Sequence, residues 1–388
     1  MNFVFLSPHF PPNYYQFCVH LHHLGVNVLG IADEPYENLH PELKAVLGEY
    51  YHVSDMHNYD ELLRGLGWFT HRHGKLDRLD SQNEYWLETE ARLRSDFNIF
   101  GLNNANIAHI KRKSLMKEMY ARAGVPYAEG AVTASLAEAR RLVKRIGYPV
   151  VAKPDIGVGA SRTYKIHNDA ELDRFFAQKP PVDYLIEEFI QGTIVTFDGL
   201  TDQQGEPVFY TSHIYSNGVM ETVNEAGDVY YYSLREIPAD LEEAGRRVLR
   251  AYDLRERFFH LEFFRTGKEG RIVALEVNMR PPGGLTTDMF NYACDIDIYH
   301  EWAHVVTHNR FTANYKRKYH CCYAGRKFGK RYAHSHEGIL RRFPHQLVHH
   351  QTITGLFSAA MGDYGYLFRS PDVEEIEAIA AFILEPQV

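Results

Sequence analysis

Two short segments of alternating apolar and polar residues carry the side chains best suited to metal chemistry. The alternating sets are Phe259, Leu261 and Phe263 against His260 and Glu262 in residues 258–264, and Val273, Leu275, Val277 and Met279 against Glu276, Asn278 and Arg280 in residues 271–280. Such alternation is typical of strands, in which successive side chains point to opposite faces of a sheet. A three-residue loop from Lys268 to Gly270 would join them as a hairpin, with Gly270 at the left-handed position that such loops favour. This loop predicts that Glu262 lies directly opposite Glu276.

The two facing carboxylates point to a divalent cation. Like charges directly opposite each other destabilise a sheet unless a positive charge lies between them. Together with the amide oxygen of Asn278 they form an all-oxygen set, which suits magnesium or manganese better than zinc. Arg280 lies two residues further along the same face, where its guanidinium could bind a phosphate or a carboxylate through two hydrogen bonds. The alternative is an exposed acidic face that is neutralised by nearby arginines.

A lysine beside a glycine-rich turn predicts a phosphate contact in residues 150–161. An apolar strand ends at Lys153 and is followed by a loop that contains Gly157, Gly159 and Ser161. Backbone N–H groups of such a loop can close over phosphates. The loop is not a Walker loop, because G-x-x-x-x-G-K-[ST] is absent. An ordinary turn between two strands is the alternative.

Another apolar strand, in residues 184–192, runs into a short connector. Backbone groups in a connector of this kind can hydrogen-bond the edge of an adenine ring. A plain crossover between two domains is the alternative.

The first hundred residues show the alternation of strands and helices that predicts a parallel α/β domain. The expected strands are 2–6, 26–32, 51–53, 78–80 and 99–100, and the expected helices lie near 13–24, 59–72 and 84–96. The turn after the first strand, residues 7–12, contains no glycine, so the dinucleotide fingerprint is missing where it would have to be. Further along, we expect helices near 136–146 and 240–253, and mostly strands between 149 and 233.

Composition excludes several classes of protein. The net charge of −8 argues against a nucleic-acid or anionic-membrane partner. No apolar run approaches the roughly 18 residues that a membrane span needs, and the N-terminus lacks the features of a signal peptide. The four cysteines have no metal or redox spacing, which favours the cytoplasm.

These motifs, in this order, resemble the ATP-grasp superfamily of the carboxylate-amine ligase type, such as the large subunit of carbamoyl phosphate synthetase and biotin carboxylase. The resemblance runs over roughly residues 104–310. Its landmarks are Lys113, the run from Tyr148 to Pro154, Gly157 to Gly159, Ile186 to Ile190, His260 to Glu262, and Leu275 to Arg280. It implies an α/β and α+β chain in which a parallel pre-ATP-grasp domain precedes a two-lobed ATP-grasp fold.

The resemblance also implies a division of the chain. The pre-ATP-grasp domain would occupy residues 1–103, and the ATP-grasp domain would occupy 104–310. The latter would have a small lobe at about 111–190 and a large lobe at about 191–310. Residues 311–388 would be the C-terminal part of the large lobe or a small closing subdomain.

Site roles follow from the same resemblance. Lys113 and Lys153 would contact the phosphates of ATP, with residues 157–161 as a lid. Residues Glu187, Glu188, Phe189 and Ile190 would form the adenine hinge. Glu262, Glu276 and Asn278 would hold two magnesium ions, with manganese as a substitute. Arg280, with Lys153, would act on the transferred phosphate or the carboxylate, and Gly283 and Gly284 could offer backbone N–H groups to the same charge.

One departure from the family pattern concerns the nucleotide. Many relatives follow the hinge with a glycine, one residue and a glutamate, whereas this chain has Gly192, Thr193 and Ile194. The acid that helps to hold the nucleotide must then come from elsewhere or be missing, and Glu225 and Asp198 are the candidates for a replacement.

The resemblance predicts an ATP-dependent ligase that converts a carboxylate to an acyl phosphate and joins it to an amine, releasing ADP and phosphate. Two alternatives remain open: a biotin-carboxylase-like or carbamoyl-phosphate-forming enzyme, and a catalytically inactive nucleotide-binding module. The expected partners are a small-molecule carboxylate and an amine, an amino acid first among them, and a second copy of the chain as in a homodimer.

Overall fold

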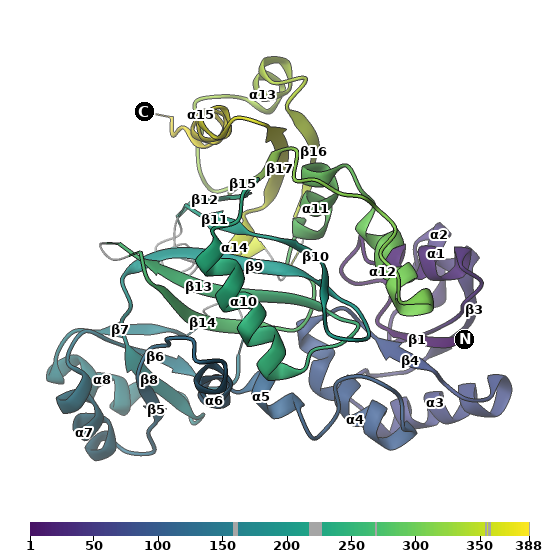
Figure 1. Cartoon of the computed structure of the whole chain (residues 1–388), viewed down its shortest axis with the longest axis horizontal. Helices are drawn as coiled ribbons and strands as arrows, with labels where there is room; N and C mark the ends of the chain where they lie inside the picture. The colour runs from purple at the N-terminus through teal and green to yellow at the C-terminus, as the bar shows by residue number, and fades with distance from the viewer. Residues whose placement is uncertain (158–161, 217–226, 268–269, 354, 356–357, 388) are drawn as a thin grey trace.

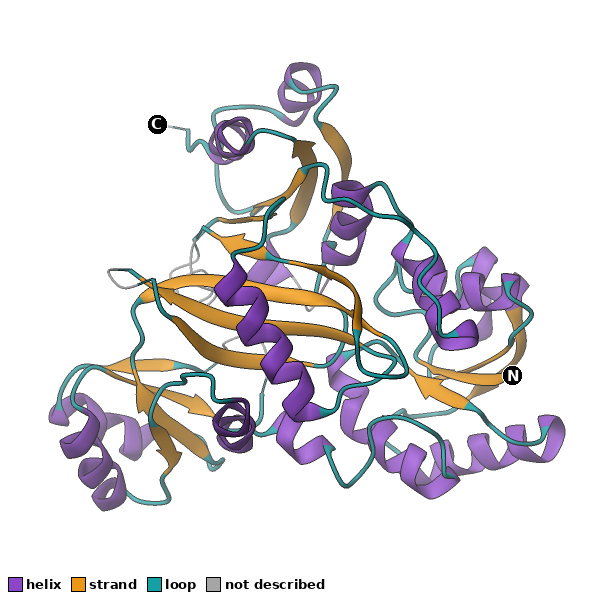
Figure 2. Cartoon of the chain, in the orientation of Figure 1, coloured by secondary structure: helices purple, strands orange, loops and turns teal. Residues whose placement is uncertain are grey.

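A computed structural model describes residues 1–157, 162–216, 227–267, 270–353, 355 and 358–387. Within these ranges, the strands assemble into three sheets that are covered by helices (Figures 1 and 2). No helix in the described part of the chain combines the length and the apolar character needed to cross a bilayer.

The N-terminal sheet is parallel, as the strand-helix alternation predicts, with the order β3-β2-β1-β4. One expected strand, residues 99–100, is wrong. Asn98 ends the preceding helix in the left-handed conformation, and the Ile99 N–H bonds the Arg94 carbonyl, so the chain closes the helix instead of extending. The elements are β1 (Asn2–Leu6), α1 (Tyr15–His23), β2 (Asn27–Ala32), η1 (Tyr36–Asn38), α2 (Pro41–Val46), β3 (Leu47–His52), α3 (Tyr59–His73), β4 (Arg78–Asp80), η2 (Glu84–Trp86) and α4 (Leu87–Phe97).

The smallest layer is an antiparallel sheet of order β5-β8-β6-β7 with two helices packed on it. One of those helices, α8, is absent from the sequence-based expectation of mostly strands between 149 and 233. Two further helices lead into this layer, and the second ends at Gly124, whose φ of 61° is the left-handed conformation common at helix ends. The elements are α5 (Ile107–Lys111), α6 (Lys113–Ala123), β5 (Gly130–Val132), α7 (Leu136–Ile146), β6 (Val150–Pro154), β7 (Tyr164–Ile166), α8 (Asp169–Gln178) and β8 (Tyr184–Glu188).

The largest sheet joins the expected hairpin to the end of the chain. Its strands follow the order β14-β13-β9-β11-β12-β15-β17-β16, with β10 paired to β9. Strands β15 to β17 therefore continue the sheet that contains the hairpin. The elements are β9 (Gly192–Thr201), β10 (Pro207–Thr211), β11 (His213–Tyr215), β12 (Val229–Ser233), α10 (Ala239–Tyr252), β13 (Phe258–Thr266), β14 (Ile272–Asn278), α11 (Thr286–Cys294), α12 (Ile298–His308), β15 (His320–Arg326), α13 (His336–Arg342), β16 (Leu347–Thr352), α14 (Ser358–Met361), β17 (Tyr364–Ser370) and α15 (Val373–Leu384).

Helices α6 and α10 cover one face of this sheet at the hairpin. Figure 1 shows α10 running across strands β9, β13 and β14. Buried apolar side chains of both helices pack with Phe259, Leu261 and Phe263 of β13. Because side chains alternate along a strand, His260 and Glu262 must lie on the opposite face.

The hairpin register at the acidic pair is confirmed, although the loop that predicted it is wrong. Glu262 pairs with Glu276 and His260 with Asn278, but Thr266 already bonds Arg271, so the loop is one residue longer than expected. A β-bulge between Glu262 and Phe263, opposite Leu275, restores the predicted pairing. The bulge also changes the apolar set. Ile272 and Ala274, in place of the expected Val273 and Leu275, join Val277 and Met279 in the core.

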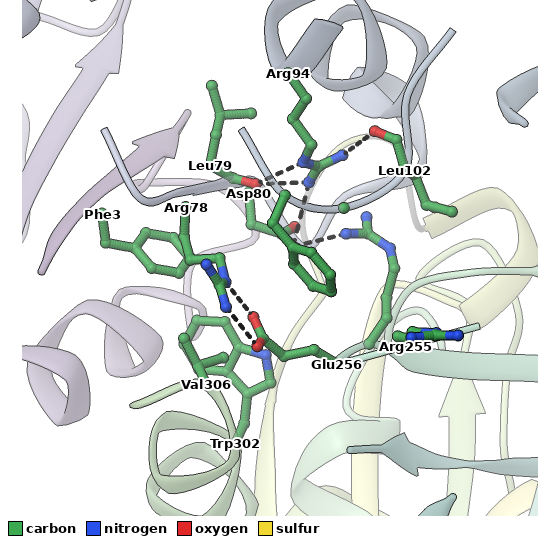
Figure 3. A pocket seen from close by; sticks show the side chains of 13 residues that line it. Phe3, Arg78, Leu79, Asp80, Arg94, Leu102, Arg255, Glu256, Trp302 and Val306 are labelled. Atoms are coloured by element: carbon green, nitrogen blue, oxygen red, sulfur yellow. Dashed lines mark hydrogen bonds and ion pairs between the residues drawn. The ribbon is translucent and has the colours of Figure 1, made fainter. Parts of the chain in front are cut away.

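Charged residues tie the N-terminal sheet to the large sheet. A pocket at this junction is lined by Arg78, Asp80, Arg94, Glu256 and Trp302, among others (Figure 3). The Arg78 guanidinium donates two hydrogen bonds to the Glu256 carboxylate, at 2.6 and 2.9 Å. Arg78 and Glu256 thus pair with each other across the junction between the two sheets.

Candidate active site

The hairpin places two carboxylates and an amide on one face of the large sheet. The Glu262 and Glu276 side chains are 18% and 21% exposed, and Asn278 is buried. Burial would raise the pKa of Glu262, but His260 and Arg280 outweigh it and lower that pKa. Glu262 therefore stays ionised and accessible to a cation.

Arg280 lies at the end of the same face. Its Nη2 donates to the Asn278 Oδ1 at 3.5 Å, and its Nη1 donates to the Pro281 carbonyl at 2.8 Å. The Nε lies 3.4 Å from an oxygen of Glu84, which comes from η2 after the N-terminal sheet. Glu84 has no signal in the sequence, because only the packing of the two sheets brings it here. Gly283 and Gly284 follow Arg280, and the Gly283 carbonyl accepts a hydrogen bond from Thr286.

Lys113, at the start of α6, reaches the acidic pair. Its Nζ lies 3.2 Å from the Glu276 Oε1 and donates to the Gly157 carbonyl at 2.7 Å. The same ammonium group thus touches a predicted metal ligand and the first residue of the predicted phosphate loop. Gly159 and Ser161, the other residues expected in that loop, lie outside the described residues.

Lys153, at the end of β6, is held by the buried Glu187. The Glu187 Oε1 lies 2.6 Å from the Lys153 Nζ, and its Oε2 lies 2.6 Å from the Lys117 Nζ. Burial would lower the pKa of Lys153, but Glu187, Glu276 and Glu262 outweigh it and raise that pKa. The charged form of Lys153 is therefore favoured. Sequence reasoning missed Lys117, although its place four residues after Lys113 on one helix face was a usable signal.

The predicted hinge residues divide into two kinds. Glu187 and Glu188 use their side chains within the protein, Glu187 as above and Glu188 to accept from the Glu129 N–H at 2.7 Å. Phe189 lies under the Lys165 ammonium, 3.6 Å from the ring centroid. Among the described residues, the Ile190 N–H has no hydrogen-bond acceptor. The assignment of residues 187–190 to the adenine hinge stays a prediction.

Asp198 has no oxygen free for a nucleotide. It lies on β9 and is fully buried, and its two oxygens bond the Nδ1 atoms of His260, at 2.6 Å, and His213, at 2.7 Å. The expectation that Asp198 could replace the missing hinge acid is therefore wrong. Glu225, the other candidate, lies outside the described residues.

The Asp198 contacts set the charge of His260. Burial would lower the pKa of His260, but Asp198 and Glu262 outweigh it and raise it to about 9. Burial would likewise raise the pKa of Asp198, but His260 and His213 outweigh it and lower it to about 2. At neutral pH an imidazolium therefore lies between two carboxylates.

The donor set fits a hard divalent cation. Two carboxylates and an amide oxygen, two of them partly exposed, match the oxygen ligands that magnesium takes while it keeps water and phosphate oxygens in its shell. Across the described residues, no group of three or more His, Cys, Asp and Glu side chains is arranged to hold a metal on its own.

Comparison with known proteins agrees with this arrangement. The sequence profile of the ATP-grasp domain matches residues 146–288, which include Lys153, Glu187, Glu262, Glu276 and Arg280. The chain contains an ATP-grasp domain. Its matched segment takes in most of the small sheet and the part of the large sheet that carries the acidic pair.

Two curated proteins that resemble this chain are a synthase and a ligase. The carbamoyl phosphate synthase large chain of Methanothermobacter thermautotrophicus is 27% identical over 134 residues, which is 33% of this chain and 12% of that protein. The L-arginine-specific L-amino acid ligase of Bacillus subtilis is 22% identical over 241 residues, which is 58% of this chain and 56% of that protein. The chain therefore spans about half of the second relative and a small part of the first.

Solved structures share the fold over nearly the whole chain. The L-amino acid ligase of Bacillus licheniformis has a TM-score of 0.75 at 14% identity, and the superposition covers 98% of this chain and 95% of the ligase chain. The N5-carboxyaminoimidazole synthetase of Staphylococcus aureus has a TM-score of 0.71 at 13% identity, with coverage of 99% and 97%. The biotin carboxylase domain of the Hydrogenobacter thermophilus 2-oxoglutarate carboxylase, solved with MgADP, has a TM-score of 0.68 at 17% identity, with coverage of 97% and 89%. These likenesses confirm the predicted fold class.

Proposed function

We propose that this protein is an ATP- and magnesium-dependent ligase that forms an amide or peptide bond between a small carboxylate and an amine. The observation that carries the proposal is the pairing of Glu262 with Glu276 beside Asn278 and Arg280, within reach of Lys113. Two carboxylates, an amide, a guanidinium and an ammonium group thus lie close together in the domain that we propose to bind ATP.

The chemistry follows from the poor reactivity of a carboxylate toward amines. Transfer of the γ-phosphoryl group makes an acyl phosphate, which is a far better electrophile, and this step needs mainly positioning and charge neutralisation. Lys113 and Lys153 bind the phosphates, and Arg280 binds the transferred group or the carboxylate. Two magnesium ions held by Glu262, Glu276 and Asn278, or manganese in their place, would offset the charge on the phosphoryl oxygens.

Amino acids are the first substrates to test. Arg280 suits any carboxylate. The alignment with the L-amino acid ligase of Bacillus subtilis covers 58% of this chain, and the aligned residues are 22% identical. We further propose that the adenine binds at residues 187–190 and that residues 1–103, 104–310 and 311–388 are the functional units. The four cysteines are free and buried, which supports a location of the protein in the reducing cytoplasm. The precedent for a homodimer is the biotin carboxylase domain described above, which was solved as a dimer.

The test is phosphate release from ATP and magnesium in the presence of paired carboxylate and amine pools, amino acids first. Release should require both partners. Glu276→Gln keeps an oxygen near Lys113 but removes a metal carboxylate. It should cut the rate by more than about 100-fold, above the loss typical of groups that only support a metal ligand.

Glu129→Gln is the matched control, because the side chain of that glutamate is exposed and, within the described part of the chain, pairs only with the exposed Arg145. It should release phosphate at the wild-type rate. Release with bicarbonate alone would instead indicate a carboxylase-type reaction. No release with any pool, together with no rise in melting temperature on adding ATP and magnesium, would show that the ligase proposal is wrong.

A further inference from the structure

A row of buried polar side chains runs beneath the acidic pair and has no direct part in the proposed phosphate contacts. The Glu262 Oε1 bonds the His260 Nε2 at 3.0 Å, and the His260 Nδ1 bonds the Asp198 Oδ1 at 2.6 Å. The other Asp198 oxygen accepts from Thr196 and bonds the His213 Nδ1 at 2.7 Å. The row thus leads from a partly exposed carboxylate into the sheet.

Strand pairing forces these side chains together. Strand β13 pairs with β9 so that His260 faces Asp198 and Glu262 faces Thr196. Strand β11 pairs with the other edge of β9, through Ile214 and Val195, which places His213 beside Thr196. All of these residues lie on the face opposite to the apolar core under α10.

The row has one accessible end. His213, Asp198 and His260 are 1%, 0% and 5% exposed, and only Glu262 reaches solvent. Among the described residues, the Glu262 Oε1 is bonded to His260 while its Oε2 has no hydrogen-bond or ion-pair partner. One oxygen is therefore held in place and the other is left for a ligand.

A purely structural role accounts poorly for this arrangement. A buried charged row costs desolvation free energy, and apolar residues of similar volume often stabilise a protein at least as well. Hydrogen bonds to a metal-ligating carboxylate from a second side chain are, in contrast, typical of metal sites, because they fix the orientation of the ligand. The accessible end of this row is the proposed metal carboxylate.

We propose that His260, itself held by Asp198, is a positioning residue that orients Glu262 and keeps its Oε2 available to a divalent cation. This inference rests on the proposed function, because it takes Glu262 to be a magnesium ligand. The ligand class is a hard divalent cation bound together with the phosphates of ATP.

Two substitutions at one position separate the two contacts of His260. His260→Asn keeps a polar group toward Asp198 but cannot reach Glu262. His260→Gln has the length to donate to Glu262 where the Nε2 atom did, while it loses the Asp198 contact. His213→Gln is the control, because it removes a partner of Asp198 but leaves the His260–Glu262 contact unchanged.

The measurement is the dissociation constant of Mn²⁺, detected by EPR of the free ion, for the full chain saturated with a non-hydrolysable ATP analogue. His260→Asn should weaken Mn²⁺ binding by about 10- to 100-fold, and His260→Gln should recover part of the loss. His213→Gln should keep the wild-type constant. Melting temperatures, measured alongside, should fall for all three variants, because each disturbs the same buried row.

Wild-type Mn²⁺ affinity in a folded His260→Asn protein would overturn the inference and leave the proposed function intact. So would an equal loss in His213→Gln and His260→Asn. If His260→Asn does not fold, Asp198→Asn replaces it. Weaker Mn²⁺ binding by Asp198→Asn than by His213→Gln would support the inference, and equal binding by the two variants would contradict it. Failure of the wild-type chain to bind Mn²⁺ with the analogue would overturn both the inference and the proposed function.

Discussion

At the scale of single residues, Glu187 shows how a buried carboxylate holds Lys153, which we propose to bind phosphate, together with Lys117. Its carboxylate lies 2.6 Å from both the Lys117 and the Lys153 ammonium groups, and all three side chains are nearly buried. Removing one partner of such a group leaves uncompensated charge in a poorly solvated place. The two lysines are therefore kept in position by an acid that would itself be costly to bury alone.

Glu187→Gln should lower the free energy of unfolding by about 3 kcal/mol at neutral pH, because two ammonium groups lose their counter-charge. Urea unfolding followed by circular dichroism measures this change. Glu129→Gln breaks an ion pair of the same length, 2.6 Å, whose partners are 53% and 64% exposed. It should cost less than about 1 kcal/mol. Equal losses in both variants would contradict the role of burial.

The loss in Glu187→Gln should depend on pH. Burial would raise the pKa of Glu187, but Lys153 and Lys117 outweigh it and hold the pKa below its ordinary value. A carboxyl with a depressed folded-state pKa stabilises the protein above its unfolded-state pKa, about 4.3. That stabilisation is lost as the pH falls through the folded-state pKa. The difference in the free energy of unfolding between wild type and Glu187→Gln should therefore be largest at pH 7 and decrease below pH 4.3. A difference that increases in acid would contradict the role of Glu187.

At the scale of elements, the hairpin depends on a loop and a bulge that compensate for each other. The loop between β13 and β14 has one residue more than a three-residue turn, and the bulge opposite Leu275 absorbs it before the acidic pair. Gly270 ends the loop with φ 63°, a conformation that L-residues with side chains rarely adopt. Gly267 opens the same loop without a positive φ and with open space around it.

Gly270→Ala should destabilise the protein by about 1 kcal/mol, since a left-handed alanine costs roughly 1–2 kcal/mol. Thermal unfolding would show this as a lower melting temperature. Gly267→Ala is the matched control in the same loop, and it should leave the melting temperature unchanged or slightly raised. A greater loss at Gly267 than at Gly270 would show that the loop conformation is not as described.

At the scale of the whole molecule, Arg257 joins the N-terminal sheet to the candidate active site. Its guanidinium lies 2.7 Å from Asp80 and 3.1 Å from Glu90, and its Nε donates to the Met279 carbonyl at 2.6 Å. Met279 stands between Asn278 and Arg280. The joint between the sheets is therefore also a backbone support for two proposed site residues.

Arg257→Met should lower the free energy of unfolding by about 3–5 kcal/mol, because the buried Asp80 and Glu90 lose a partner. Differential scanning calorimetry should show the lower transition. Arg255→Met, two residues earlier, removes an exposed pair with Asp253 and should change stability by less than about 1 kcal/mol. Similar unfolding temperatures in the two variants would show that the junction contributes little to stability.

The sequence by itself determined the parallel N-terminal sheet, the hairpin with Glu262 opposite Glu276, and the grouping of Arg280 and Asn278 on one face. These features depend on alternation and on turns between neighbours in the chain, and such short-range geometry is visible in the order of residues. It also indicated Lys113 and Lys153, through a resemblance that spans about half of the chain.

Only the tertiary structure decided the surroundings of these residues. The contact of Asp198 with His260 spans 62 residues, and it exists because β9 pairs with β13 in a register that places the two residues opposite each other. Glu84 reaches Arg280 because two sheets pack together, and Lys117 meets Glu187 because α6 lies beside β8. Sheet order and layer packing minimise the free energy of the whole chain, so contacts between distant segments leave no local pattern that a sequence could reveal.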